Sequence, residues 1–225
     1  MTNHLNLFVP YENAGASHEN QLTRALIIVL RYSPLAHASW LRLVAPDLSL
    51  HKLSKAEYAT QRQNVLIPGK ELPESEAMEG ISVWLAPDAT EVVNLMASSD
   101  RHQILDGIVT YGNDLVIVIE NKIAVGAPTN QPHQINLHGS PVKFRDKVSS
   151  ISWQRLLGTF SELVEHDLVS GAERHLVTDF LEFVEEHFPY IGPYANLMQC
   201  GDNAYRMKRR LDTVQGQVTR TDVGK

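Results

Sequence analysis

Two runs of β-branched and apolar residues, joined by a glycine, constrain this chain more than any other feature. The run ILDGIVTY spans residues 104–111 and DLVIVIENKI spans residues 114–123, with Gly112-Asn113 between them. β-Branched residues favour strands, and a short connection containing glycine favours a hairpin. The second run is apolar at successive positions up to Glu120, which is typical of a central strand covered on both faces. We therefore predict a hairpin whose second strand lies inside a sheet.

Three charged residues interrupt these apolar runs. Asp106 lies in the first run, and Glu120 and Lys122 end the second. Buried charges are costly unless they are paired or bind a metal. Glu120 and Lys122 are two residues apart and so face the same side of a strand. Asp106 shares that side if the loop has an odd length. A three-residue loop over residues 111–113, a five-residue loop or a bulge would achieve this, and a two-residue turn would not.

Two carboxylates and a lysine grouped in this way suit metal-assisted hydrolysis of a phosphodiester. Mg²⁺ prefers oxygen ligands and usually takes one or two carboxylates together with waters and substrate phosphate. Asp106 and Glu120 are the candidate metal ligands, and the backbone carbonyl of Ile119 or of Asn121 is a candidate further ligand. Lys122 would hold the attacking water or stabilise charge on the phosphate.

The same residues resemble the D…(D/E)xK signature of the PD-(D/E)xK nuclease superfamily, with Asp106 followed by Glu120-Asn121-Lys122. The segment HENQLTRAL, with Glu19, resembles the helix that often supplies an additional acid in that superfamily. Gln131 or Gln134 occupies the place where many members have a glutamine, and Leu105 stands where the signature has a proline that is commonly missing. The resemblance covers roughly residues 15–190.

This resemblance implies an α/β (α+β) fold with a restriction endonuclease-like central mixed sheet flanked by helices. It implies a nuclease that uses Mg²⁺, for which Mn²⁺ can substitute, and whose substrate is nucleic acid, DNA rather than RNA. The implied catalytic residues are Asp106, Glu120, Lys122 and Glu19. Many members act in restriction or anti-phage defence. Because such an enzyme must be restrained in its host, we expect a regulatory protein partner or a homo-oligomer.

Other interpretations of these residues remain open. The three charged residues could form a structural salt bridge at a strand end, in which case the chain would be an inactive binding or assembly module of the nuclease fold. Glu19 also suits the first turn of a helix for dipole reasons alone. A different Mg²⁺-dependent phosphotransfer enzyme is disfavoured because the chain has no GxxxxGK[ST] loop.

The remaining residues that could carry chemistry give weaker signals. His133 and His138 are five residues apart in a loop, which is an unspecific spacing for zinc. We expect Trp153 and Phe180 to be core residues and residues 208–210, Lys-Arg-Arg, to lie on a solvated helix face. Cys200 has no histidine or acid near it in sequence and is not expected to be a nucleophile.

Periodicity and turn residues indicate how the rest of the chain is organised. Helices are predicted over residues 18–31, with Ser17 as a cap, and through Val44 after a break at Ser33-Pro34. Residues 46–80 are polar, with short strands near 64–67, and a strand follows at 81–85. A loop is predicted over 124–141, a strand over 148–151, and helices over 153–164 and 173–187. We expect a nuclease-like domain over residues 1–194, and a helical appendage or the start of a further module over 195–225.

Charge and composition set limits on location and partners. The formal net charge of −6 argues against a wholly basic nucleic-acid coat protein but permits an enzyme with local basic patches. A single cysteine fits a reducing compartment. The apolar runs fall short of the roughly 20 residues that cross a bilayer, and the N-terminus lacks the pattern of a secretory signal. We therefore expect a cytoplasmic protein that does not bind membranes.

Overall fold

The structure is a computed structural model that describes residues 7–8, 19–49, 55–63, 77–87, 104–122, 136–137, 140–194 and 197–222. It is a mixed α/β fold, as predicted. The helices are α1 (Glu19–Tyr32), α2 (Pro34–Val44), α3 (Trp153–Glu165), α4 (Gly171–His187) and α5 (Ala204–Asp222), with a short 3-10 helix η3 (Leu197–Cys200). The strands are β1 (Ala56–Gln63), β2 (Met78–Ala86), β3 (Ile104–Tyr111), β4 (Leu115–Asn121), β5 (Asn136–Leu137), β6 (Ser140–Phe144) and β7 (Ser149–Ser152).

The strands form one mixed sheet in the order β1-β3-β4-β2-β6-β5, and β7 pairs with β2 beyond the end of β6. β3 pairs antiparallel with β1 on one side and with β4 on the other, whereas β2 runs parallel to β4, β6 and β7. β4 lies between β3 and β2, and every residue of β4 except Glu120 is buried. The predicted central strand and central mixed sheet are therefore confirmed.

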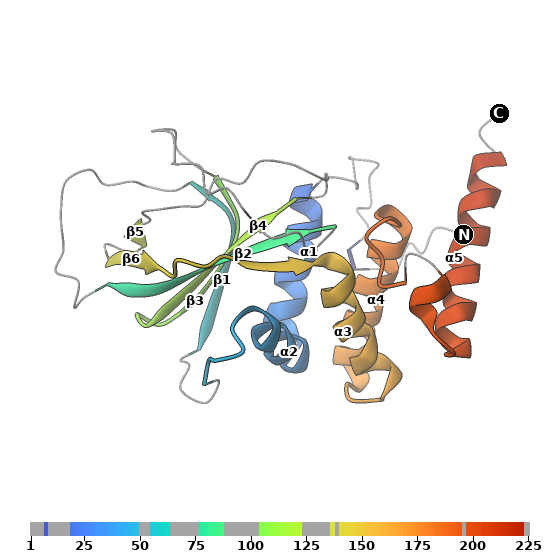
Figure 1. Ribbon diagram of the computed structural model, residues 1–225, viewed down its shortest axis with the longest axis horizontal. Helices are drawn as coiled ribbons and strands as arrows, with labels where there is room; N and C mark the ends of the chain where they lie inside the picture. The colour runs from blue at the N-terminus through green and yellow to red at the C-terminus, as the bar shows by residue number, and fades with distance from the viewer. Residues whose placement is uncertain are drawn as a thin grey trace.

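The alternating side chains of the hairpin point into two different cores. Val109, Ile117 and Ile119 belong to a large core that also contains the buried faces of α1, α2, α3 and α4. Ile108 and Val118 point the other way, into a smaller cluster with residues of β2 and β6. Figure 1 shows α3 and α4 beside the sheet, with α5 outermost.

The helix boundaries follow from their caps. The Oγ atom of Ser33 accepts a hydrogen bond from the Ala36 N–H at 3.1 Å, and Pro34 occupies the first turn of α2, where its missing N–H costs nothing. The Oγ atom of Ser152 accepts from the Arg155 N–H at 3.1 Å and begins α3 in the same way. The four predicted helices of residues 18–187 are confirmed within two residues at each described end. Ser17, the predicted cap of α1, lies outside the described residues.

Two segments that we predicted to be irregular contain strands. β1 lies within residues 46–80 and was missed, because its sequence AEYATQRQ lacks an apolar run. Among the described strands β1 pairs only with β3, so it lies at an edge of the described sheet and can carry polar side chains. β5 and the start of β6 lie within the predicted loop over 124–141, and β5 has only two residues. The strands predicted near 64–67 lie outside the described residues.

The C-terminal segment is helical, as predicted, and α5 contacts the rest of the fold through charged side chains. Arg206 forms an ion pair with Glu165 of α3 at 2.9 Å, and Arg209 forms one with Glu185 of α4 at 3.0 Å. The Arg209 side chain is only 14% exposed, so our expectation that residues 208–210 lie on a solvated face is wrong for this residue. The division of the chain into a domain over residues 1–194 and an appendage over 195–225 stays a prediction.

Replacement by alanine is expected to have opposite effects on stability at two glycines. A Cβ atom at Gly80 of β2 would lie 2.6 Å from Cγ1 of Val142 and 2.8 Å from Cδ1 of Phe144, whereas a Cβ at Gly158 of α3 would meet nothing within 4 Å. We expect Gly80→Ala to lower the free energy of unfolding by about 1–3 kcal/mol because of overpacking. Gly158→Ala should raise it by about 0.5–1 kcal/mol because alanine favours the helix. Urea unfolding of both variants measures this, and equal shifts of one sign would contradict it.

None of the helices within the described residues is long and apolar enough to span a membrane.

Candidate active site

The loop of the β3–β4 hairpin has the odd length that the proposed grouping requires. Tyr111 pairs with Leu115, so the loop contains the three residues 112–114, one position later than predicted. Gly112 has a φ angle of +54°, a left-handed conformation that glycine adopts without strain. Asp106 lies one residue beyond the last ladder pair, Gly107 with Ile119, and its charge is near enough to Glu120 to raise the pKa of that residue. The predicted grouping of Asp106 with Glu120 is confirmed.

The two strands cease to pair where the acidic residues lie. Gly107 and Ile119 form the last pair of the ladder. Beyond it, Oδ2 of Asp106 accepts a hydrogen bond from the backbone N–H of Asn121 at 2.9 Å. One carboxylate oxygen of Asp106 therefore completes the hydrogen bonding of β4. The other has no part in that bond.

Glu120 and Lys122 form an ion pair with 3.0 Å between Oε1 and Nζ, and about a fifth of each side chain is exposed. Burial and then the charge of Asp106 raise the pKa of Glu120 to about 7, although Lys122 opposes the rise. Burial alone would lower the pKa of Lys122, but the charges of Glu120, Glu19 and Asp106 hold it above its ordinary value. The charges of Glu19, Asp106, Glu120 and Lys122 therefore interact electrostatically at the end of the hairpin.

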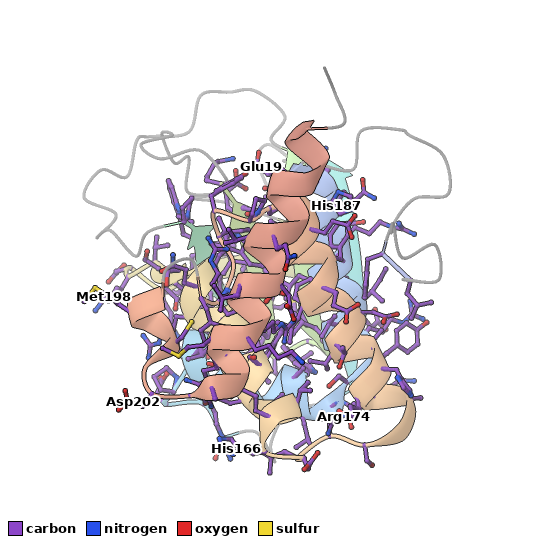
Figure 2. The ribbon with its side chains drawn as sticks, turned by 90° about the vertical axis from the view of Figure 1, so that its right-hand side faces the viewer. Glu19, His166, Arg174, His187, Met198 and Asp202 are labelled. Carbon is purple, nitrogen blue, oxygen red and sulfur yellow. The ribbon has the colours of Figure 1, made fainter. Side chains whose placement is uncertain are left out.

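Glu19 reaches this place from the first turn of α1, where it is half-buried. Its negative charge contributes to the raised pKa of Glu120 and of Lys122. Figure 2 shows Glu19 and His187, the last residue of α4, toward the same end of the helices. All four predicted site residues thus lie in one region, and they come from β3, α1, β4 and the residue that follows β4.

Sequence reasoning missed a polar network beneath these residues. The Asn121 side chain is fully buried, and its Nδ2 atom donates to the Glu19 carbonyl and to Oγ1 of Thr23, both at 3.1 Å. Its Oδ1 atom accepts from Nε1 of Trp153 at 2.9 Å. The sequence signal that could have indicated this network was Asn121 itself, an amide in an otherwise apolar strand, on the side that faces α1. We had considered only the backbone carbonyl of Asn121.

Tyr190 is a second residue that sequence reasoning did not identify. It follows α4, and its side chain is 52% exposed. Partial burial and the nearby charge of Glu19 raise its pKa, which places its hydroxyl within electrostatic reach of the acid. No spacing in the sequence connects Tyr190 to Glu19. The approach arises because α4 ends beside the start of α1 (Figure 2).

The carboxylates of Asp106 and Glu120 offer oxygen ligands, the kind that Mg²⁺ prefers. Within the part of the chain that the structure describes, no three His, Cys, Asp or Glu side chains are arranged to hold a metal ion together. Asp106 and Glu120 form a two-carboxylate set, which Mg²⁺ commonly completes with waters. A divalent cation would offset the repulsion that raises the pKa of Glu120.

The other residues considered from sequence give a mixed outcome. Trp153 and Phe180 are fully buried, which confirms them as core residues. Residues Gln131, His133, Gln134 and His138 lie outside the described residues. A cavity of about 230 Å³ lies at the opposite end of α3 and α4 from Glu19 (Figure 2), and its lining includes His166 and Arg174 but none of the four site residues.

Comparison of the chain with known protein families, with curated proteins and with solved structures found no match.

Proposed function

We propose that this chain is a metal-dependent nuclease that hydrolyses phosphodiester bonds, with DNA as the expected substrate. The observation that carries the proposal is that Asp106, bound to the Asn121 N–H where the two strands cease to pair, lies near enough to Glu120 for its charge to raise the pKa of Glu120. Lys122 lies 3.0 Å from Glu120, so the carboxylates and an ammonium group face one space. This is the set of groups that metal-assisted phosphodiester hydrolysis needs.

Each residue has a distinct role in the proposal. Asp106 and Glu120 would hold Mg²⁺ or Mn²⁺, and a bound ion would polarise the phosphoryl oxygen and lower the pKa of an attacking water. The hydrogen bond from the Asn121 N–H fixes the Asp106 carboxylate in place before any ligand arrives. Lys122 keeps its proton because its pKa is raised, so it can stabilise negative charge on the phosphate. Glu19 would orient water at the edge of the site.

The alternative is a binding or assembly module in which the Glu120–Lys122 pair is only structural. The raised pKa of Glu120 argues for the enzyme. A carboxylate in a stabilising ion pair normally has a lowered pKa, whereas burial and neighbouring acids raise that of Glu120 despite Lys122. A site that holds unfavourable charge is typical of functional positions.

Cleavage assays with Lys122→Ala test the proposal. We expect the wild-type protein to cut plasmid or single-stranded DNA with Mg²⁺ or Mn²⁺ and not with EDTA. Lys122→Ala should lower the rate at least about a hundredfold, since it removes the cation that would stabilise the phosphate.

Lys147→Ala provides the control, because it removes an exposed lysine from the turn before β7. Its rate should equal that of the wild type. Cutting that survives Lys122→Ala would mean that the site is misassigned. Absence of metal-dependent cutting by the wild-type protein, on DNA and RNA alike, would favour the binding module.

A further inference from the structure

A buried amide connects the two sides of the candidate site. Asn121 lies between Glu120 and Lys122 in sequence, but its side chain points the opposite way, under α1. Its backbone N–H binds Oδ2 of Asp106, while its side-chain Nδ2 binds the carbonyl of Glu19. A single residue thus contacts a candidate metal ligand at one end and the first turn of α1 at the other.

Every polar atom of this amide has a partner. Nδ2 uses both hydrogens, one for the Glu19 carbonyl and one for Oγ1 of Thr23, and Oδ1 accepts from Trp153. Asn121 and Trp153 are fully buried, and Thr23 is 1% exposed. Hydrogen bonds in such surroundings are stronger than in water, and they hold their groups in one arrangement. The network therefore joins α1, β4 and α3 at a single point.

The first turn of α1 is the element that depends most on this network. The first N–H groups of a helix lack intrahelical partners, and such ends fray readily, so external contacts to the first turn help to hold it. The carbonyl of Glu19 receives the Nδ2 donor of Asn121 and also the hydroxyl of Thr23, at 3.2 Å. These bonds hold the backbone of Glu19 against β4. The Glu19 side chain therefore extends from a main chain that is held in place.

We infer that the Asn121 side chain is a positioning residue, which fixes the first turn of α1 so that the Glu19 carboxylate acts on the cation held by Asp106 and Glu120. This inference rests on the proposed function. Groups that orient ligands from behind commonly change metal affinity by 10–100-fold when they are replaced. Asn121 touches neither the cation nor the phosphate, and its effect passes through Glu19.

Mn²⁺ binding to the full chain, measured calorimetrically without DNA, tests the inference. Asn121→Leu keeps the approximate volume and removes all three side-chain hydrogen bonds, and we expect Mn²⁺ to bind about tenfold more weakly. Ser33→Ala is the matched control. Ser33 is also fully buried and hydrogen-bonded, to Glu173 and as the cap of α2, but it lies beyond the far end of α1. Ser33→Ala should change the affinity less than twofold.

A double-mutant cycle distinguishes an effect of Asn121 that passes through Glu19 from a general destabilisation of the fold. If Asn121 acts through Glu19, then Asn121→Leu should weaken Mn²⁺ binding by less than about twofold in a Glu19→Gln background. Thr23→Val should cause a smaller loss in the same direction, and it replaces Asn121→Leu in the cycle if the latter does not fold. An equal loss with and without Glu19 would overturn the inference.

The outcomes also distinguish this inference from the proposed function. Mn²⁺ binding that Asn121→Leu and Thr23→Val leave unchanged, but that Glu120→Gln abolishes, would overturn the positioning role and leave the nuclease proposal standing. A wild-type protein that binds no Mn²⁺ would overturn the proposed function, and the inference would fall with it.

Discussion

Replacing Glu120 by glutamine is expected to abolish metal-dependent cleavage and, in the same protein, to raise the stability of the fold at pH 8. Glutamine keeps the shape of the side chain but cannot supply the negative charge that Mg²⁺ needs. We expect the cleavage rate to fall about a thousandfold or more, the size of effect found when one group that stabilises developing charge is removed. The same substitution removes a buried charge that Asp106 and Glu19 repel.

The gain in stability has a defined pH dependence. The Glu120 carboxyl has an ordinary pKa of 4.5 and a pKa of about 7 in the folded protein. Between these values the folded protein keeps a proton that the unfolded chain releases. The contribution of Glu120 is therefore fully present below pH 4.5 and is lost as the pH rises through 7. Allowing for the 20% exposure of the side chain, the loss is roughly 2 kcal/mol by pH 8.

Urea unfolding of the wild type and Glu120→Gln at pH 5 and pH 8 measures this difference. The advantage of the variant should grow by roughly 2 kcal/mol between the two pH values. Mn²⁺ should stabilise only the wild type, because binding to the folded state alone raises stability. Glu57→Gln makes the same change at an exposed position of β1 and is the control. A variant that is less stable than the wild type at pH 8 would show that the Glu120–Lys122 pair is structural.

The second large effect is a loss of stability at low pH that depends on His37. This residue of α2 is half-buried, with its Nδ1 atom 3.0 Å from the Tyr58 hydroxyl and its Nε2 atom 2.5 Å from the Tyr111 hydroxyl. Tyr58 donates its own proton to the carbonyl of Leu30 at 3.0 Å, so its oxygen accepts from Nδ1–H. Because burial lowers its pKa to about 4, His37 is neutral at pH 7, and its Nε2 atom then accepts the proton of Tyr111.

Burial lowers the pKa of His37 from its ordinary value of 6.5 to about 4. Between these values the unfolded chain binds a proton that the folded protein does not bind, so stability falls as the pH is lowered from 6.5 to 4. The side chain retains partial exposure, and we expect its share of the loss to be roughly 2 kcal/mol.

His37→Gln keeps a neutral hydrogen-bonding group that cannot be protonated. Comparison of its urea unfolding with that of the wild type from pH 4.5 to 7.5 cancels the titration common to both proteins. The difference should shrink as the pH falls. His175→Gln, at an exposed position of α4, controls for removal of a histidine. A constant difference across this range would contradict the role of His37.

Local patterns predicted the parts of the structure that local physics determines. The hairpin, the central position of β4 and helices α1 to α4 follow from apolar periodicity, caps and turn residues. The odd length of the hairpin loop was among the predicted alternatives, and it sets the register that pairs Gly107 with Ile119 beside the two acids. These features depend on residues close together in sequence.

Features that depend on distant contacts were not predictable in the same way. β1 is a polar strand because only β3 pairs with it, and edge status is a property of the whole sheet. The partners of Asn121 come from positions 98 and 102 residues away in α1 and 32 residues away in α3. Tyr190 meets the charge of Glu19 only because α4 and α1 lie together. No local pattern carries this information.

The strand order has a consequence for how the molecule acquires its site during folding. β3 and β4 are joined by three residues, whereas β2 precedes both in the chain and must join the far side of β4 as a parallel neighbour. Hairpins close within microseconds, and pairings between distant segments form later. Asp106 and Glu120 therefore meet early, as a repelling pair still open to water. Glu19, which reaches β4 across about a hundred residues of intervening chain, arrives only when α1 docks, so the acids become desolvated last.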